Sequence, residues 1–413
     1  MHYSVIIVGA GPAGAVLAYL LAKSGISVLL LERHSDFHRQ FRGEILMPGG
    51  LEPLAQIGLW KQFNDVPQVR LNGVNLFIKG KRASTVDFEK QLFGEYGPRW
   101  VSQPHLLEMI VAECSQYKNF ELLRGTRVRD VVKNSHRVIG VSAETNGTRR
   151  EIRADLVIGA DGRTSSVRRA LKLPVRSDVI PMDVIWLKVP GPGSAEPRIH
   201  AYTGHGRLLI AAPTYDHQLQ MGLIIKKGSF KALREQGQAG LLDELVKYVD
   251  PELKDHLTHH YDNVSNPFLL STVSDCLIDW SYPGSFLIGD AAHTMSPVGG
   301  QGLNIAIRDA IVTANHLVPE LTSGNPLTDL TQTTHRIQAE RSKEVGSIQK
   351  LQALPPKILL TDTWWTRLLF LLLLWVSRGR RKLIKTISRK SFFGKFTMGV
   401  TEVRWQAPDR HQN

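Results

Sequence analysis

Cysteine is almost absent from this chain. Its 413 residues include only two, Cys114 and Cys276, which are far apart in the sequence and lack the spacing of metal ligands. This scarcity excludes a disulfide-stapled scaffold of the secreted kind, and we expect no metal site. No leader segment precedes the first apolar strand, which begins close to Met1, so we expect a cytoplasmic protein.

Long apolar stretches are scarce as well. One unbroken apolar run covers the nine residues Leu368–Val376, whereas a helix that spans a bilayer needs about 20. Tryptophans flank the run, as they do at membrane interfaces. Apolar and basic residues in this arrangement favour a helix lying in an anionic membrane surface, so we expect peripheral attachment to the inner face of the membrane. A core or dimer helix with a solvated basic continuation is the open alternative.

Acidic residues are too few to balance the basic ones. The chain has 51 Lys and Arg against 38 Asp and Glu, which gives a net charge of +13. A basic protein can bind nucleic acid, but no recognised nucleic-acid-binding module accompanies this charge. Nine of the positive charges lie between Arg367 and Lys395, where no acidic residue occurs. We therefore expect an anionic membrane surface, and no nucleic acid, as the partner of this block.

The strongest pattern in the chain lies at its start. The β-branched run Val5–Val8 predicts a buried parallel strand, and an amphipathic helix ending at Gly25 follows it. Between strand and helix stand Gly9, Gly11 and Gly14, at the G-x-G-x-x-G spacing. These glycines serve a tight turn, the approach of backbone to a pyrophosphate, and close helix–strand packing, respectively. The pattern therefore predicts a dinucleotide-binding turn.

The residues around this turn complete the expected site. Pro12 and Ala13 open the helix, whose N-terminus directs N–H groups and partial positive charge at phosphates. A second strand, Ser27–Leu31, leads into Glu32 and Arg33, and the Glu32 carboxylate suits a ribose diol. Both FAD and NAD proteins open in this way, so later stretches must decide which dinucleotide binds.

Two further strand-to-loop motifs carry chemistry. An apolar strand near residues 155–158 ends in Gly159-Ala160-Asp161-Gly162, and a helix follows. The strand Ser285–Ile288 ends in Gly289-Asp290, where an acid suits a polyol hydroxyl. A glycine-rich loop and a helix start come next, and both allow backbone N–H groups to approach a ligand. The candidate residues of this loop are Pro297, Gly299, Gly300, Gln301, Gly302, Leu303 and Asn304.

The remaining segments predict a second, antiparallel layer. Residues 74–89 form an expected hairpin that turns at Gly80, and Gln103–Cys114 is an expected helix. Residues 120–153 resemble a three-stranded meander with a turn at Asn146-Gly147. Residues 172–280 alternate strand-like runs and turns around one expected helix near 229–248, which favours a substrate layer over the cofactor.

The order GAGPAG, GADG and GDAAHTMSPVGGQG resembles the single-component FAD-dependent monooxygenases of the p-hydroxybenzoate hydroxylase fold, over roughly residues 3–320. The resemblance implies that the first motif holds the ADP half of FAD. It assigns Asp161-Gly162 to FAD and NAD(P)H binding, Gly289-Asp290 to the ribityl chain and the loop from Pro297 to Asn304 to the flavin ring. Arg42 and Gln103 also match FAD-contacting positions.

The resemblance also implies a reaction. NAD(P)H reduces FAD, dioxygen adds to give a C4a-hydroperoxyflavin, and one oxygen atom hydroxylates or epoxidises a small lipophilic aromatic or isoprenoid substrate. The stretch RGEILMPGGLEPLAQIGL is similar to squalene epoxidases, and GDAAHTMSPVGGQGLN to ubiquinone-biosynthesis hydroxylases. Oxygen transfer requires no side-chain acid or base, so the sequence identifies no catalytic residue. Backbone N–H groups at the start of the last helix suit stabilisation of negative charge on the flavin.

Two related classes of flavoprotein differ from this chain in their motifs. A flavin-dependent prenyl-lipid reductase of the geranylgeranyl type is the alternative function, although such enzymes usually carry GDAAG where this chain has GDAAH. Flavin halogenases carry a W-x-W-x-I-P segment that this chain lacks. The sequence leaves open the substrate, the choice between NADH and NADPH, and the oligomeric state.

The expected fold class is α/β, with a Rossmann-like FAD-binding domain interleaved with an antiparallel-sheet substrate domain. We expect the FAD-binding domain to comprise residues 1–70, 101–170 and 281–320, and the substrate domain residues 71–100 and 171–280. Residues 321–413 form an expected helical, basic and membrane-associated segment. Because the cofactor motifs end before residue 320, we expect residues 364–413 to be dispensable for FAD binding.

Overall fold

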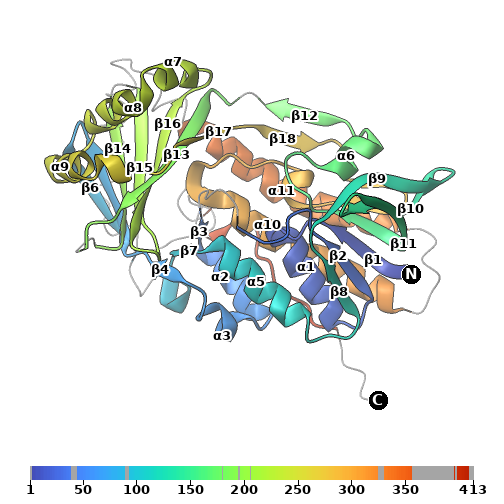
Figure 1. The fold of residues 1–413 in the computed structure, drawn as a ribbon. Coiled ribbons are helices and arrows are strands. Elements are labelled where there is room, and N and C mark those ends of the chain that lie inside the picture. Colours follow the sequence, from blue (N-terminus) through green and yellow to red (C-terminus); the bar gives the residue numbers. More distant parts are fainter. Residues whose placement is uncertain are drawn as a thin grey trace.

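The computed structural model shows two lobes, each built around one large sheet (Figure 1). The structure describes residues 2–38, 44–88, 93–178, 180–193, 196–204, 206–323, 330–355, 395 and 398–408. Arg42, the apolar run Leu368–Val376 and most of the basic block lie outside the described residues. The expected α/β class, with parallel and antiparallel sheets in one chain, is confirmed.

The larger sheet has eight strands and a parallel centre. Its strands run in the order β19 (Ser281–Tyr282), β20 (Ser285–Leu287), β11 (Thr148–Gly159), β1 (His2–Val8), β2 (Val28–Leu31) and β8 (Phe120–Leu123). The neighbours from β20 to β8 pair in parallel. The centre of β1 and all of β2 are buried apolar residues, as a sheet covered on both faces requires.

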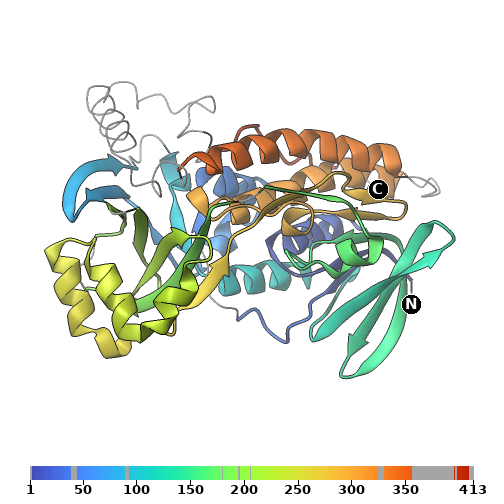
Figure 2. The same cartoon turned by 90° about the horizontal axis from the view of Figure 1, so that it is seen from above.

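Helices that contact one another pack on this sheet (Figures 1 and 2). They are α1 (Pro12–Lys23), α5 (Gln103–Cys114), α10 (Gln301–Thr322) and α11 (Thr331–Gln352). The bounds of α5 agree with the predicted helix. The side chains of Leu17, Leu106 and Ile311, from three of these helices, belong to one continuous apolar core. That core holds the ends of the central strands in fixed positions.

A meander branches from β11, a central strand of the sheet, and contributes apolar residues to the same core. The long strand β11 pairs with β10 (Arg137–Thr145), which pairs with β9 (Thr126–Asn134), all antiparallel. The turn at Asn146-Gly147 has positive φ at both residues, 50° and 78°, as a type I′ hairpin requires, so that prediction is confirmed. The predicted first strand of the meander is two strands, because β8 leaves it to pair in parallel with β2.

The second lobe contains a seven-stranded, mostly antiparallel sheet. Its order is β17 (Phe268–Ser271), β13 (Met182–Pro190), β16 (Gln218–Lys226), β15 (Arg207–Pro213), β14 (Arg198–Gly204), β5 (Gly73–Ile78) and β6 (Lys81–Asp87). The hairpin predicted at Gly80 is β5–β6, and it joins this sheet through β14. Strands from two distant parts of the chain therefore build one layer.

Three short helices cover one face of the second sheet, where the sequence predicts one. They are α7 (Phe230–Glu235), α8 (Gly237–Val246) and α9 (Pro251–His259). Gly237 has a φ of 70°, which ends α7, and the Asp250 side chain caps a new helix that starts at Pro251. Leu233, Leu241 and Leu257 pack from these helices onto the sheet.

Small elements join the lobes. The strands β3 (Ile45–Leu46), β7 (Arg99–Val101) and β4 (Gln68–Arg70) form a three-stranded sheet. The helices α2 (Pro48–Gln56) and α3 (Trp60–Phe63) follow β3. A pair of strands, β12 (Val175–Asp178) and β18 (Ser274–Leu277), links the second lobe back to α6 (Ser166–Leu171) and the first.

The chain beyond residue 320 does not form a separate body in the described part. Helix α11 buries Ile337, Val345 and Ile348 in the core of the first lobe. Val403, near the C-terminus, is 4% exposed in the same core. Within the described residues, no helix has the length and apolarity needed to cross a membrane. The other proposed domain boundaries stay predictions.

Candidate functional site

The three glycine-containing motifs follow three neighbouring parallel strands, β1, β11 and β20. β1 lies between β2 and β11. The strand that follows β1 in the chain is therefore on one side of it, and the later strands β11 and β20 are on the other side. Ligands of open α/β sheets bind outside the carboxyl ends of strands at such a switch point. The motifs meet there: a Cβ on Gly9 would lie 2.6 Å from the Ala160 carbonyl oxygen, and one on Gly289 would lie 3.1 Å from the Ala13 Cβ.

The three glycines of the turn between β1 and α1 differ in the space around them. We call a glycine closed where an added Cβ would meet backbone atoms, as at Gly9 and Gly14, and open where it would meet nothing, as at Gly11. Gly9 has a φ of 100°, and a Cβ on Gly14 would lie 2.0 Å from the Gly9 carbonyl oxygen. A Cβ on Gly11 would meet nothing within 4 Å. Helix α1 starts at Pro12 with no side-chain cap. Open space beside uncapped first-turn amides fits a pyrophosphate.

Glu32 lies beside this turn. Its side chain is buried, Oε2 accepts a hydrogen bond from the Ala10 N–H at 3.0 Å, and Oε1 accepts one from the His34 N–H at 3.1 Å. The carboxylate is thus fixed next to the glycine turn, where a ribose of the dinucleotide would lie. Arg33 is exposed and donates to the ring of His34, so its side chain does not reach the turn.

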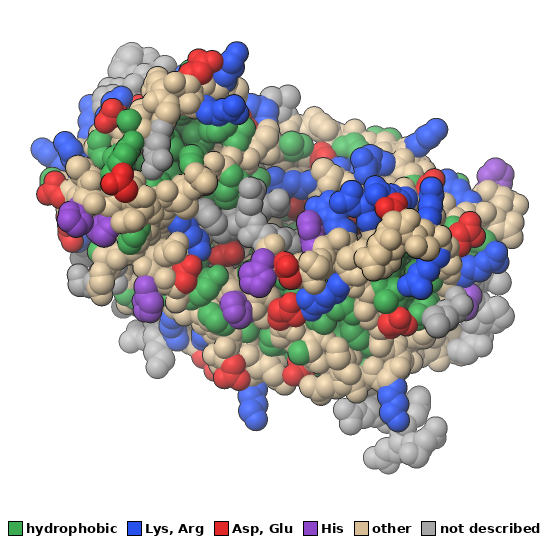
Figure 3. Space-filling view, viewed as in Figure 1, with side chains coloured by type: hydrophobic (Ala, Val, Ile, Leu, Met, Phe, Trp, Pro, Cys, Tyr) green, Lys and Arg blue, Asp and Glu red, His purple; other side chains and the backbone are tan. Residues whose placement is uncertain are grey.

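Asp161 is occupied by its own loop. Its carboxylate accepts hydrogen bonds from the Ser165 hydroxyl and from the N–H and hydroxyl of Ser166, at 2.5–2.7 Å. It therefore supports the start of α6, whose N-cap is Ser165, by accepting from the first helical N–H, while Gly162, with a φ of 77°, turns the chain. Figure 3 shows Lys and Arg side chains gathered on the face over α6 and β9. Basic side chains are thus not confined to the C-terminal part of the sequence but also gather near this motif.

Asp290 is the partly exposed acid of the third motif. Arg163 Nε lies 3.4 Å from Asp290 Oδ2, which links the second and third motifs. The Gly289 N–H donates to Asp309 Oδ2 at 3.0 Å, so a buried carboxylate of α10 fixes the end of β20. The Asp290 side chain is 31% exposed, which leaves it accessible to a polyol chain.

The loop before α10 is pinned to β3. Asn304 is buried, accepts a hydrogen bond from the Met47 N–H at 2.9 Å and donates to the carbonyls of Ile45 and Gly300. A Cβ on Gly300 would lie 2.1 Å from Ile45 Cγ2, whereas one on Gly302 would meet nothing within 4 Å. The loop therefore has a side closed by β3 and an open position at the helix start.

The other predicted residues of this loop have local roles. Pro297 precedes the short 3₁₀ turn Val298–Gly300, in which Gly299 has a φ of 73°. Gln301 is buried, and its amide donates to the Gly299 carbonyl oxygen at 2.9 Å. Leu303 belongs to the apolar core of the first lobe. These contacts fix the backbone of the loop, and its binding of flavin stays a prediction.

A buried network of charged side chains lies behind this loop. Arg308 pairs with Glu344 through two hydrogen bonds of 2.8 and 2.9 Å, and Arg341 bridges Glu344 and Asp309. His293 Nε2 lies 2.7 Å from Asp309 Oδ2. The two arginines lower the pKa of Glu344 to about 2, against the opposing effect of burial. The network ties α10, α11 and the end of β20 together.

The C-terminal residues complete this network. The Val400 N–H donates to Glu344 Oε1 at 2.8 Å, and the Thr401 carbonyl accepts from Arg308 at 2.5 Å. A Cβ on Gly49 in α2 would lie 2.9 Å from the Met398 backbone. Residues 398–403 are therefore part of the first lobe. The dispensability of residues 364–413 for FAD binding stays a prediction, and the contacts of residues 398–403 with the buried ion network argue against it for this part.

A second buried carboxyl, Glu44, stands where β3 meets the seven-stranded sheet. It is 4% exposed, and its Oε2 has no hydrogen-bond partner among the described residues. The Gln103 backbone N–H bonds this carboxyl, and burial raises the pKa of Glu44 to about 7 although Lys188 lowers it. Gln103, a predicted FAD contact, is the first residue of α5 and thus lies at this junction.

The face of the seven-stranded sheet away from α7–α9 is apolar. Val184, Trp186 and Ile224 are buried there, and Val298 of the glycine-rich loop packs against them. A Cβ on Gly222 would lie 2.8 Å from the Trp186 ring, so the indole lies over Gly222 on the neighbouring strand. The Trp186 Nε1 is buried and has no partner among the described residues.

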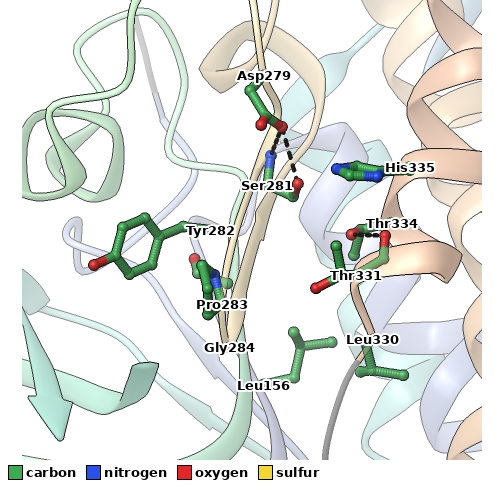
Figure 4. Close-up of a pocket in the computed structure, with 11 residues that line it drawn as sticks. Leu156, Asp279, Ser281, Tyr282, Pro283, Gly284, Leu330, Thr331, Thr334 and His335 are labelled. Carbon is green, nitrogen blue, oxygen red and sulfur yellow. Dashed lines mark hydrogen bonds between the residues drawn. The ribbon is translucent and has the colours of Figure 1, made fainter. Parts of the chain in front are cut away.

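One hollow of the described structure lies away from this site. It has a volume of about 240 Å³ and lies between β19–β20 and the start of α11 (Figure 4). Tyr282, Thr331 and His335 line it, and none of the residues predicted to bind FAD does. Within the described residues, no group of three or more His, Cys, Asp and Glu side chains could hold a metal ion.

Sequence reasoning missed the charged network and the junction carboxyl. The signal for the network was the pair Arg308-Asp309 in an otherwise apolar stretch of α10. Glu344 and Arg341, three residues apart on α11, were not recognisable as its partners because they are distant in sequence. Glu44 stood in a quoted motif, but its burial follows from contacts with elements that sequence spacing does not relate.

Comparisons with known proteins agree with this geometry. A family model described as an FAD binding domain matches residues 2–345. The 6-methylpretetramide 4-monooxygenase of Streptomyces rimosus is 32% identical over 363 residues, which cover 87% of this chain and 85% of that enzyme. Squalene epoxidase 3 of Arabidopsis thaliana is 27% identical over 334 residues, which cover 79% of this chain and 61% of that enzyme.

Solved structures share the fold. The p-nitrophenol 4-monooxygenase PnpA from Pseudomonas putida DLL-E4 matches with a TM-score of 0.81 at 18% identity, over 97% of this chain and 99% of that one. P. aeruginosa PqsL in complex with 2-aminobenzoylacetate matches with a TM-score of 0.75 at 22% identity, over 87% and 97%. Identities this low show the fold alone.

These findings settle the family. The relatives described are monooxygenases or epoxidases, so the alternative of a prenyl-lipid reductase finds no support. The open positions at Gly11 and Gly302 and the uncapped start of α1 fit FAD. The chain belongs to the FAD binding domain family and is an FAD-dependent monooxygenase, with NAD(P)H as the family's usual reductant.

Proposed function

We propose that this monooxygenase hydroxylates a lipophilic aromatic substrate held between the glycine-rich loop and the apolar face of the seven-stranded sheet. The observation that carries the proposal is the Trp186 indole lying over Gly222 on that face. The relative with the higher identity of the two described is named as a 4-monooxygenase of 6-methylpretetramide. Hydroxylation is therefore favoured over the epoxidation for which the squalene epoxidases are named.

The size of the apolar face supports a ring system as substrate. Val184, Trp186, Ile210 and Ile224 lie on the neighbouring strands β13, β16 and β15. Strands are about 4.8 Å apart, so three of them span roughly 10 Å, the width of two or three fused rings. Flat apolar walls hold aromatic rings by burial and offset stacking.

The cofactor residues are assigned on the same grounds. We propose that the first-turn amides of α1 bind the pyrophosphate through the space beside Gly11, and that Glu32 binds the ribose. Asp290 is accessible to the ribityl chain, and the amides near Gly302 face the flavin. FAD, when bound, supplies the redox chemistry with NAD(P)H and dioxygen. The protein's part is to orient the ring, exclude water and stabilise negative charge with backbone amides.

Oxygen-18 labelling tests this function. The FAD-loaded protein is supplied with NAD(P)H and, separately, 1-naphthol, a prenylated quinol and squalene. We expect a naphthol product that gains one labelled atom under oxygen-18 gas. Labelled product from squalene alone would replace hydroxylation by epoxidation. Turnover of a substrate without oxygen would overturn the monooxygenase reaction.

Peripheral membrane association belongs to the same proposal. Its support is the sequence from Trp364 to Lys395, with an apolar run and nine positive charges, which lies almost entirely outside the described residues. A basic residue near an anionic surface contributes about 1 kcal/mol, and salt weakens this contribution. The full chain should sediment with anionic vesicles more than with neutral ones. Equal sedimentation with both, or none with either, would contradict the association.

A further inference from the structure

Glu44 is a buried carboxyl with one oxygen that accepts no hydrogen bond from the described residues. Its side chain is 4% exposed, and Oε2 has no hydrogen-bond partner among the described residues. An unpaired polar atom in a protein interior is costly, and structures rarely keep one without a reason. The contrast with Glu344, whose two oxygens accept several donors, shows that this fold can satisfy a buried carboxylate.

The groups around Glu44 come from three elements. The Gln103 N–H approaches from the start of α5, and Lys188 and Asp216 act on the carboxyl from the second sheet. Lys188 Nζ lies 3.1 Å from Asp216 Oδ2, so the lysine charge is largely balanced by that aspartate. Tyr215, whose pKa burial raises, also faces Glu44. None of these groups donates to Oε2.

Glu44 is also next to the proposed substrate face. Its neighbour Ile45 contacts the glycine-rich loop at Gly300, and Ile45 shares an apolar cluster with Ala212. Ala212, Gln220 and Lys188 lie side by side on three neighbouring strands. Lys188 is two residues after Trp186, and Gln220 is two residues before Gly222, so all of these residues lie on the same face of the sheet. The sheet face is thus apolar at its centre and polar at the end that meets Glu44.

We propose that Glu44 binds a ring hydroxyl of the substrate, with Oε2 accepting the hydrogen bond, while Trp186 packs on the ring. The inference rests on the aromatic substrate proposed above and makes Glu44 its specificity-determining residue. A phenolic or enolic hydroxyl is the chemical group that fits, because it donates one hydrogen bond and its ring accepts apolar surroundings. A site built to bond a hydroxyl discriminates strongly against an analogue that lacks it.

A matched pair of ligands isolates this hydrogen bond. We would titrate the FAD-loaded protein with 1-naphthol and with 1-methoxynaphthalene, which keeps the ring and loses the donor, and follow the flavin absorbance. The wild type should bind the naphthol at least about 30-fold more tightly, as a bond to a charged acceptor implies. In Glu44→Gln the preference should fall below about 3-fold, with binding of the ether unchanged.

A purely structural role for Glu44 gives a different pattern. It would weaken both ligands equally in Glu44→Gln and leave the preference for naphthol intact, which would overturn the inference. The matched control is Glu108→Gln, a carboxylate paired with Arg124 at the surface, and it should retain the full preference. Because an ionised carboxylate is the stronger acceptor, the wild-type preference should also grow as pH rises through about 7.

Failure of the proposed function has its own signature. If neither ring compound binds or is oxidised while NAD(P)H still reduces the FAD, the aromatic substrate is wrong and the role of Glu44 falls with it. If both ring compounds bind with equal affinity in the wild type, the aromatic substrate stands and the role of Glu44 alone is overturned.

Discussion

Two buried glutamates of this protein are in opposite situations. Glu344, between α10 and α11, accepts hydrogen bonds from Arg308, Arg341 and the Val400 N–H, and its pKa is lowered to about 2. Glu44, between β3 and the second sheet, has an unpartnered oxygen, and its pKa is raised to about 7. The chain can satisfy a buried carboxylate, so we infer that Glu344 belongs to a structural region and Glu44 to a region open to a ligand.

The glycines of the first motif repeat this division. Gly9 and Gly14 are closed, since a side chain at either position would meet the backbone, whereas Gly11 is open. Closed positions hold the fold together, and open positions are available to FAD. Substitutions at closed positions should therefore reduce stability, whereas substitutions at open positions should reduce FAD binding.

The largest effect should follow from breaking the closed network. Glu344→Gln removes the carboxylate that Arg308 and Arg341 share and leaves Arg341 with Asp309, and breaking a buried ion pair costs about 3–5 kcal/mol. We expect a matching loss of unfolding free energy in denaturant titrations of the FAD-loaded protein. The low pKa of Glu344 adds stability above the unfolded value of about 4.5, and this stability is lost as pH falls toward 2. An unchanged midpoint would contradict the structural role.

Deleting residues 398–413 attacks the same network from the C-terminus. The deletion removes the Val400 N–H, the Thr401 carbonyl and the buried Val403 side chain. We expect the protein to lose FAD or to aggregate, whereas deletion of residues 409–413 alone should have no effect on flavin content. A deletion to residue 398 that retains full flavin would show that the network does not need these partners.

The glycine division can be broken at one turn. Gly11→Val places a side chain in the open space, so the protein should fold but bind no flavin. Gly14→Val forces a side chain against the Gly9 carbonyl and should prevent folding. Far-ultraviolet circular dichroism and the flavin absorbance separate the two outcomes. Full flavin occupancy in Gly11→Val would place the phosphates elsewhere.

A smaller effect is expected at Asp161. This carboxylate bonds the first N–H of α6 and the hydroxyl of the N-cap Ser165, so Asp161→Ala should cost about 1–2 kcal/mol of unfolding free energy, as loss of a helix cap does. FAD content should stay close to that of the wild type, because the carboxylate is occupied by Ser165 and Ser166. Loss of FAD without loss of stability would return Asp161 to the cofactor-contacting role that the family resemblance implies.

The sequence was informative where function depends on local spacing. The strand–glycine–helix unit at Gly9–Gly14, the helix Gln103–Cys114 and the turn at Asn146-Gly147 follow from short-range rules, and the structure has them. The pairing of Glu344 with Arg308 and the isolation of Glu44 depend on chain segments that meet only in the folded state. Periodicity carries no information about such meetings, so these features required the structure.

The pH dependence of unfolding tests the division between closed and open regions most directly. We would measure unfolding midpoints of the FAD-loaded wild type and Glu44→Gln between pH 5 and pH 9. The raised pKa of Glu44 means that the wild type loses stability as pH rises from about 4.5 through about 7, because the buried carboxyl must then ionise. The variant carries no such charge. The difference between its unfolding midpoint and that of the wild type should therefore increase up to about pH 7 and then stay constant. Parallel curves for the two proteins would show that Glu44 is satisfied like Glu344, and the account of an open ligand site would be wrong.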